Sequence, residues 1–157
     1  MEHSGDVLIG GIRTSRLSRR ELAEAMAGQA ATGAKGPGPR LVFDLNGHGL
    51  AMSFWDRAYR DDLMTADVVH ADGQPLVIAS RLLTRTPIAE RSATTDMIHD
   101  LAAEAQRSGR SFFLLGGTEE VNRACEQKLR ALYPGLMIAG RRDGYFSREE
   151  EEEVCRA

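Results

Sequence analysis

The sequence is poor in cysteine and has no long apolar run. Cys125 and Cys155 are its two cysteines, and neither belongs to a C-x-x-C or Cys/His spacing. This argues against a disulfide framework or a cysteine-ligated metal site and fits a reducing cytosol. No apolar run approaches the roughly 18–20 residues that span a bilayer, and the N-terminus lacks a charged-then-apolar signal pattern. We therefore expect that the chain crosses no membrane.

A surplus of basic residues is also missing. Lys and Arg number 20 against 23 Asp and Glu, which gives a net charge of -3. A protein that binds duplex nucleic acid normally carries a basic face, so we expect no nucleic-acid partner. The chain has 157 residues, of which 42% are hydrophobic and 27% charged, as in an ordinary soluble globular protein. We expect one domain over residues 1–157.

Short apolar runs alternate with helical patterns along the chain. Strands are expected at 7–9, 41–45, 68–70, 112–115 and 136–139. Helices are expected at about 18–31, 50–58, 75–83, 98–108 and 118–132, and from 147 onward. Capping boxes are predicted for Ser18 with Glu21 and for Ser147 with Glu150, and the glycine- and proline-rich stretch 32–39 is expected to be a loop. This alternation predicts an α/β fold with a mostly parallel sheet and helices on both of its faces.

The segment Ala71-Asp72-Gly73 follows a short apolar run and is expected at the carboxyl end of a strand. Ligands of parallel sheets bind outside these strand ends, and Asn46 follows a second one. We therefore expect Asp72 and Asn46 to line one pocket, with Asp72 as a candidate general base. Asp-Gly is also a common turn dipeptide, so a purely structural role for Asp72 stays open.

Three further features carry candidate chemistry. Gly116 and Gly117 lie between a strand and a helix, where free backbone N–H groups hold phosphate, although a close-packed turn is an equal interpretation. Arg91 precedes a helix and can bind a diphosphate with its forked guanidinium. His48 and His70 are interpreted as packed or exposed residues rather than catalysts. The sequence has no D-x-D pair and no G-x-S-x-G elbow, so neither metal-dependent transfer nor a serine nucleophile is expected.

Five segments, in this order and spacing, resemble the WecG/TagA/CpsF family of bacterial glycosyltransferases over about residues 6–153: LVFDLNGHGL, TADVVHADGQPLVIASRLL, ERSATTDMIHDLA, SFFLLGGTEE and YPGLMIAGRRDGYFS. The resemblance implies a Rossmann-like, three-layer αβα fold and an inverting transferase that needs neither a metal nor another cofactor. Such an enzyme moves an N-acetylmannosamine-type sugar, its uronic acid or glucose from a UDP-sugar donor to a polyprenyl-diphosphate-linked saccharide. Its products are exopolysaccharides, teichoic acid linkage units or surface antigens, and it works in the cytoplasm, peripherally at the inner face of the cytoplasmic membrane.

The resemblance also assigns site residues. Asp72 falls on the family's general base, and Arg91 aligns with an arginine near the donor diphosphate. Asp44 stands where the family often has threonine, and this places a second carboxylate near the first. Motifs and resemblance together give the expected substrate-binding residues Asp44, Asn46, Gly73, Arg91, Gly116 and Gly117.

Family members normally continue for several dozen residues, so we expect the chain to be incomplete at its C-terminal end. Two other functions therefore stay open: a non-catalytic module that binds nucleotide sugars, and an unrelated Rossmann-like domain that holds another nucleotide at 116–117. Arg81 and Arg85 flank Leu82-Leu83, which fits either contact with anionic lipid or a solvated helix end. Association of several copies into a homo-oligomer also stays open.

Overall fold

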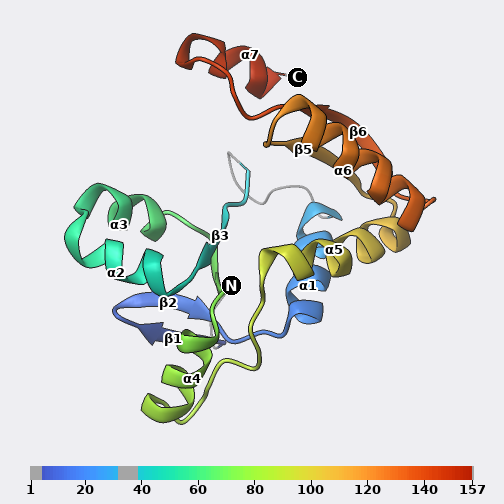
Figure 1. The fold of residues 1–157 in the computed structure, drawn as a ribbon. Helices are drawn as coiled ribbons and strands as arrows, with labels where there is room; N and C mark the ends of the chain where they lie inside the picture. The colour runs from blue at the N-terminus through green and yellow to red at the C-terminus, as the bar shows by residue number, and fades with distance from the viewer. Residues whose placement is uncertain (1–4, 32–38, 157) are drawn as a thin grey trace. The chain divides into compact units, whose positions relative to one another are not determined.

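The computed structural model describes residues 5–31 and 39–156 (Figure 1). The chain divides into two compact units, Met1–Asp100 and Leu101–Ala157, and each is described separately below. The loop expected at 32–39 lies outside the described residues except for Pro39. The expectation of one domain over 1–157 stays a prediction.

The first unit opens with an antiparallel hairpin formed by β1 (Asp6–Ile9) and β2 (Ile12–Ser15). Gly10 and Gly11 connect the strands with φ angles of 57° and 81°, which favour glycine, and two such residues match the twist of a tight hairpin. The strand predicted at 7–9 is confirmed. The sequence analysis missed β2 because two of its buried residues are the polar Thr14 and Ser15, so the segment shows no apolar alternation.

A parallel pair of strands forms the centre of the first unit. β3 (Val42–Leu45) runs beside β4 (Val68–Ala71), with Asp44 opposite His70 and Leu45 opposite Ala71. Successive side chains in a strand point to opposite faces. One face therefore carries Phe43, Leu45, Val69 and Ala71, which all belong to or pack against the hydrophobic core. The other face carries Asp44 and His70, so it is the polar face of the pair.

Helices follow the strands of this unit. They are α1 (Arg19–Ala31), α2 (Gly47–Trp55), α3 (Arg57–Met64), α4 (Gln74–Leu83) and α5 (Thr94–Ser108), the last of which continues into the second unit. The capping box predicted at α1 is confirmed: the Ser18 N–H donates to Glu21 Oε2 at 2.8 Å, and the Glu21 N–H donates to Ser18 Oγ at 3.3 Å. Pro75 lies in the first turn of α4, as expected.

One helix predicted by the spacing of Leu50, Phe54 and Ala58 is in fact two. Asp56 separates α2 from α3 with an extended backbone (φ −111°, ψ 106°). Its Oδ1 accepts the Tyr59 N–H at 3.0 Å, so Asp56 ends one helix and caps the next. The prediction of one continuous helix was wrong because apolar spacing does not report this local side-chain cap.

The second unit contains a second parallel strand pair. β5 (Ser111–Leu115) and β6 (Met137–Arg142) flank α6 (Glu119–Leu132) in the sequence, and a register shift occurs between Phe112 and Phe113. A 3₁₀ turn, η1 (Arg148–Glu150), leads into α7 (Glu151–Arg156), and the capping box of Ser147 with Glu150 is confirmed.

The helical spacing of Val121, Cys125, Leu129 and Leu132 predicts that these four residues form the core face of α6, and this is correct only for Leu129. Val121, Cys125 and Leu132 are exposed, whereas Asn122 and Leu129 are buried. Asn122 and Leu129 are seven residues apart, which is two helical turns, so they share one face. The sequence analysis placed this face wrongly because it did not expect a buried asparagine. Taken by themselves, the two units confirm an α/β fold with parallel strands and packed helices, consistent with a Rossmann-like fold.

Candidate functional site

Asp72 directly follows β4, at the carboxyl end of that strand. Its backbone N–H donates to the Leu45 carbonyl at 2.9 Å, which extends the pairing of β3 and β4 by one residue. The residue is partly buried, and its Oδ2 accepts the Thr94 N–H at 3.4 Å. A strong N–H···O bond is shorter, typically about 2.7–3.2 Å. The carboxylate is therefore held loosely and can accept a proton or a ligand hydrogen bond.

Asn46 and Gly73 lie beside each other at the same end of the strand pair. Asn46 is the N-cap of α2, and its Oδ1 accepts the Gly49 N–H at 2.9 Å. A Cβ atom on Gly73 would lie 3.4 Å from Asn46 Cα, so the Asp72-Gly73 turn packs closely on Asn46. The cap uses the amide oxygen of Asn46, which leaves its Nδ2 as the group for a ligand contact.

His70 lies opposite Asp44 in the strand pair, two residues before Asp72, and is 2% exposed. Burial lowers the pKa of His70, while the nearby carboxylates of Asp44 and Asp72 and a hydrogen bond that His70 donates to Ser92 act in the opposite direction. The Ser92 hydroxyl donates to the Ala71 carbonyl at 3.1 Å, and it lies 3.1 Å from His70 Nδ1. The hydroxyl proton is thus already used, so Nδ1 carries the proton that is donated to Ser92 Oγ. The burial of His70 confirms the first of its two interpretations, a packed rather than an exposed residue, and its lowered pKa keeps it neutral near pH 7.

Arg91 forms an ion pair inside the first unit. Its guanidinium contacts Asp96 Oδ2 at 3.1 Å, and the same carboxylate oxygen lies 3.4 Å from Arg19. Both members of the Arg91–Asp96 pair are nearly half exposed. The Ser92 N–H donates to the Ala71 carbonyl at 2.8 Å, which anchors the segment that carries Arg91 to the end of β4. The residue after Arg91 is therefore bonded to the end of the strand that precedes Asp72. The positive charge of Arg91, however, is already matched by Asp96.

Gly116 and Gly117 form a close-packed turn in the second unit. Their φ angles are 131° and 66°, and a Cβ on Gly144 would lie 2.9 Å from Gly116 Cα. The Gly144 N–H donates to the Gly117 carbonyl at 2.8 Å. The next residue, Thr118, caps α6 by accepting the Val121 N–H at 3.3 Å. These contacts account for both glycines structurally, and their binding of a nucleotide stays a prediction.

Asn122 is a buried structural residue beside the glycine turn that the sequence analysis missed. It is 5% exposed, and its Nδ2 donates to the carbonyls of Leu114, Gly116 and Arg142 at 2.9–3.1 Å. This one side chain therefore joins the ends of β5 and β6 to the glycine turn. The available signal was an asparagine one turn into the helix that follows Gly-Gly-Thr, where an apolar residue would be usual.

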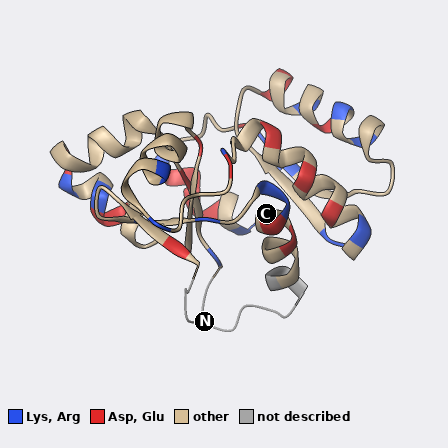
Figure 2. Cartoon of the chain, turned by 90° about the horizontal axis from the view of Figure 1, so that it is seen from below, with Lys and Arg blue, Asp and Glu red and all other residues tan. Residues whose placement is uncertain are grey.

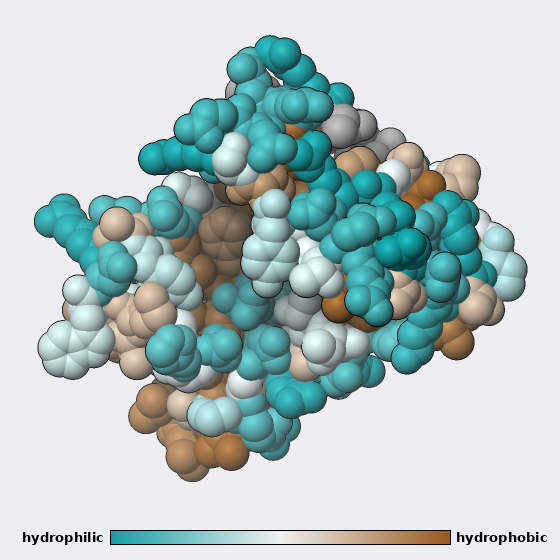
Figure 3. All heavy atoms as spheres, turned by 45° about the horizontal axis from the view of Figure 1, so that its top comes forward, coloured by the Kyte–Doolittle hydropathy of each residue, from teal (hydrophilic) through white to brown (hydrophobic). Residues whose placement is uncertain are grey.

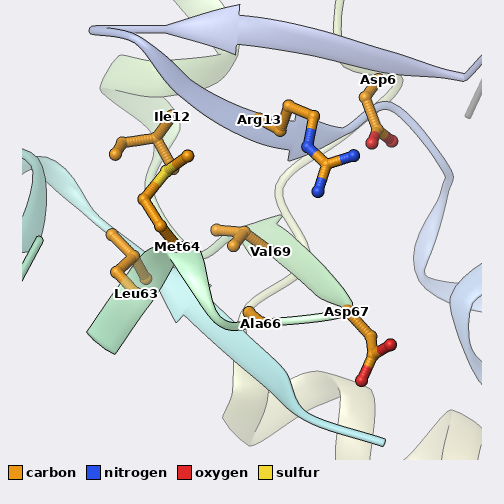
Figure 4. A pocket seen from close by; sticks show the side chains of 8 residues that line it. All are labelled: Asp6, Ile12, Arg13, Leu63, Met64, Ala66, Asp67 and Val69. Atoms are coloured by element: carbon orange, nitrogen blue, oxygen red, sulfur yellow. The ribbon is translucent and has the colours of Figure 1, made fainter. Parts of the chain in front are cut away.

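Two hollows in the first unit differ greatly in size. The smaller, of about 10 Å³, lies between β2, β4 and the end of α3, and Ile12, Met64 and Val69 are among its lining residues (Figure 4). It has room for about one water molecule and is too small for a sugar. The larger, of about 280 Å³, is lined by Phe43, Asp44, Tyr59, Asp62 and Leu63. Asp44 thus borders the larger cavity, while the lining of neither hollow includes Asp72.

Within residues 5–31 and 39–156, no three His, Cys, Asp or Glu residues are arranged to hold a metal ion. The expectation of a metal-free reaction stays a prediction.

No helix in the described part of the chain is both long and apolar enough to cross a membrane.

Two comparisons with known proteins place the chain. The model of the glycosyl transferase WecG/TagA/CpsF family matches residues 7–157. A curated relative from Bacillus subtilis (strain 168), named N-acetylglucosaminyldiphosphoundecaprenol N-acetyl-beta-D-mannosaminyltransferase, is 33% identical over 90 residues. The aligned residues cover 57% of this chain and 35% of the relative, so the match spans about a third of the relative's length.

Proposed function

The chain belongs to the WecG/TagA/CpsF family of glycosyl transferases, and from this premise we propose that it transfers a sugar from a UDP donor to a saccharide carried on a polyprenyl diphosphate. The name of the Bacillus subtilis relative supports an N-acetylmannosamine-type sugar and a lipid-linked acceptor. The uronic acid of that sugar and glucose are the other donor sugars of this proposal.

The proposed reaction is a single displacement with inversion. The Asp72 carboxylate takes the proton from the acceptor hydroxyl, whose oxygen attacks the anomeric carbon from the face opposite UDP. The bond between that carbon and the diphosphate breaks, and UDP leaves with the electron pair. Arg91 stabilises the negative charge that develops on the diphosphate, for which it exchanges its contact with Asp96 for one with the ligand. Asn46 orients the donor or acceptor through its Nδ2.

One observation carries this proposal. The Asp72 carboxylate lies at the carboxyl end of β4 and its contact with Thr94 is long, so its oxygens are available for a hydrogen bond with a ligand hydroxyl. Asn46 and Gly73 pack against each other at the same end, where ligands of parallel sheets bind.

The test measures UDP release and product formation by the full chain with UDP-N-acetylmannosamine and a polyprenyl-diphosphate N-acetylglucosamine. Asp72→Asn should lower kcat by about 10²–10⁴ and leave the melting temperature and the Kd for UDP unchanged. The matched control is Asp61→Asn, because Asp61 is an exposed carboxylate paired with Arg57. Turnover of Asp72→Asn at the wild-type rate would overturn Asp72 as the base. We propose that no metal or other cofactor takes part, so EDTA should leave turnover unchanged.

A binding-only role is the second candidate, and the ion pair with Asp96, which already matches the charge of Arg91, favours it. Such a module would bind the nucleotide sugar without turning it over. A ligand that binds only the folded state raises the melting temperature. Stabilisation of the wild type by UDP, with no turnover of any of the donor sugars, would therefore favour the binding module over the enzyme.

Membrane contact is the last part of the proposal. We propose that the protein attaches peripherally to the inner face of the cytoplasmic membrane, where a lipid-linked acceptor is presented. Exposed Leu82 and Leu83 at the end of α4, flanked by exposed Arg81 and Arg85, support this. Neither a nucleic-acid partner nor a particular number of subunits follows from these residues.

A further inference from the structure

The larger cavity of the first unit has a wall of mixed aromatic and acidic character. β3 contributes Phe43 and Asp44, and α3 contributes Tyr59, Asp62 and Leu63. The three helical residues follow the i, i+3, i+4 spacing that places side chains on one face of a helix. The cavity holds about 280 Å³, just below the roughly 300–1,000 Å³ typical of sites for drug-sized ligands. Its size suits one sugar ring better than a whole nucleotide sugar.

The walls of this cavity are held by the core. Leu63 is 4% exposed and belongs to the hydrophobic cluster, and Phe43 and Tyr59 pack against that cluster. Asp56 caps α3 through the Tyr59 N–H, which sets where the helix begins. A cavity whose lining is fixed in this way loses little conformational entropy when a ligand enters.

The Tyr59 hydroxyl lies against Gly49 and has no hydrogen-bond partner within residues 5–31 and 39–156. A Cβ on Gly49 would lie 2.6 Å from Tyr59 Oη, so a glycine at that position leaves the space for the hydroxyl. None of the described residues forms a hydrogen bond with it. The same Gly49 is bonded to Asn46 through its N–H. Gly49 therefore contacts both Tyr59, which lines the cavity, and Asn46, which lies at the same strand end as Gly73 and Asp72.

From these contacts we propose that the cavity is a subsite for the pyranose ring of an uncharged sugar, with Tyr59 and Asp62 as specificity-determining residues. This inference rests on the proposed function. Carboxylates accept hydrogen bonds from sugar hydroxyls, the tyrosine hydroxyl donates or accepts one, and aromatic rings pack on the apolar face of a pyranose. The ring belongs either to the donor sugar or to the acceptor saccharide, and the two share this chemistry.

The negative charge of its lining determines which ligands the cavity excludes. Its lining contains two carboxylates, Asp44 and Asp62, and no basic residue. Like charges at short range repel each other, and an anion that enters also loses part of its hydration. The subsite therefore excludes the diphosphate and disfavours a uronic acid ring. Of the donor sugars in the proposed function, those without a carboxylate fit it.

The experiment compares affinities of the full chain by calorimetry. One arm compares UDP, UDP-N-acetylmannosamine and the corresponding UDP-uronic acid. The other compares a short-chain polyprenyl diphosphate with and without its N-acetylglucosamine. In the arm whose ring occupies the cavity, the wild type should bind the sugar-bearing ligand about tenfold more tightly than the ligand without the ring. If the sugar ring of the donor occupies the cavity, UDP-uronic acid should bind no more tightly than UDP.

Three variants make the test specific. Tyr59→Phe and Asp62→Asn should each abolish most of the tenfold gain and leave the affinity for UDP unchanged, and Asp62→Asn should also improve binding of the uronic acid. Asp61→Asn, on the neighbouring residue outside the cavity, should keep the gain. A gain retained by both Tyr59→Phe and Asp62→Asn overturns the subsite and leaves the proposed function standing. A wild type that binds neither donor nor acceptor overturns the proposed function, and this inference with it.

Discussion

At the residue scale, the ion pair between Arg91 and Asp96 is the contact that bears most directly on ligand binding. The guanidinium is 3.1 Å from Asp96, a carboxylate that also contacts Arg19. A partly exposed pair of this kind contributes little to stability, because water screens it and two side chains lose freedom to form it. Asp96 therefore matters less as a support of the fold than as a competitor of any anionic ligand for Arg91.

This competition predicts opposite effects of two variants. Arg91→Gln should weaken UDP binding about fivefold to tenfold, since it removes a charged hydrogen bond to the diphosphate. Asp96→Asn should strengthen UDP binding, because Arg91 then meets the ligand without a competing carboxylate. Titration calorimetry with UDP measures both. Arg20→Gln is the control, as Arg20 pairs with Glu24 on an exposed face of α1. Equal weakening by both variants would show that Arg91 and Asp96 act only as a structural pair.

His70 gives a prediction about pH. Burial lowers its folded-state pKa below the ordinary value of 6.5, so near and below that value the unfolded chain binds a proton before the folded chain does. The stability is therefore complete above pH 6.5 and decreases as the pH falls from 6.5 toward the lowered pKa. His70→Gln removes this proton uptake. Between about pH 7.5 and pH 5.5, urea denaturation should show a smaller loss of unfolding free energy in the variant than in the wild type. Equal losses would contradict the assignment of a neutral, buried His70.

At the element scale, the β1–β2 hairpin is positioned by its glycine turn. Gly10 has a φ of 57°, and a Cβ there would meet Leu50 Cδ1 at 2.7 Å and the Phe54 ring at 3.1 Å. The turn thus packs directly on α2. A side chain at this position would strain the backbone and displace a helix that begins at Asn46, one of the predicted site residues.

Two glycine substitutions should therefore have opposite signs. Gly10→Ala should lower the free energy of unfolding by at least about 1–2 kcal/mol, because the left-handed conformation alone costs about that much. Gly28→Ala should raise it by about 0.5–1 kcal/mol, since Gly28 lies inside α1 and a Cβ there meets nothing within 4 Å. Urea denaturation measures both changes. Two losses of similar size would indicate that alanine acts through some effect common to both positions.

The elements that the sequence predicted correctly are those with local signals. Ser18 with Glu21, Pro75 and Thr118 mark helix starts through contacts within a few residues, and these starts are confirmed. β2 and the break at Asp56 were missed, because burial of Thr14 and Ser15 depends on distant neighbours and a cap can interrupt an apolar pattern. The local sequence therefore revealed these three helix starts, but neither tertiary burial nor a cap that lies inside an apolar pattern.

At the scale of the whole molecule, acidic and basic residues are interspersed along individual helices (Figure 2). α6 illustrates this with Glu119, Glu126 and Arg130, of which the last two are paired at 2.9 Å. The absence of a nucleic-acid partner stays a prediction, and this mixed pattern supports it.

The candidate site was predictable only in part, for a physical reason. Asp72, Asn46 and Gly73 could be named because parallel strands bring their carboxyl ends to one edge, and the structure places Asn46 and Gly73 in close contact there. The pairing of Arg91 with Asp96 depends on the conformation of two side chains, and the approach of Tyr59 to Gly49 depends on how α3 packs on α2; periodicity specifies neither. Gly116 and Gly117 belong to the second unit, and their part in a ligand site stays a prediction.

The proposed membrane attachment of the molecule rests on an exposed apolar surface of α4. Leu82 and Leu83 are 79% and 80% exposed at the end of α4, and Ile78 is 48% exposed one turn earlier. Figure 3 shows hydrophobic residues gathered at the bottom of that view, where α4 lies. Exposed apolar side chains next to Arg81 and Arg85 match the acyl and anionic layers of a bilayer surface.

The protein should therefore sediment with vesicles that contain anionic lipid and much less with purely zwitterionic ones. Replacing both Leu82 and Leu83 with serine should abolish most of this binding, because it removes the largest exposed apolar area of α4. Arg81→Gln should weaken it about fivefold, since a basic residue near an anionic surface contributes about 1 kcal/mol. Val121→Ser is the control, as Val121 is 60% exposed on another helix. If the leucine variant sediments like the wild type, α4 does not contact the membrane; if the wild type forms dimers that the leucine variant loses, a second copy covers this surface instead.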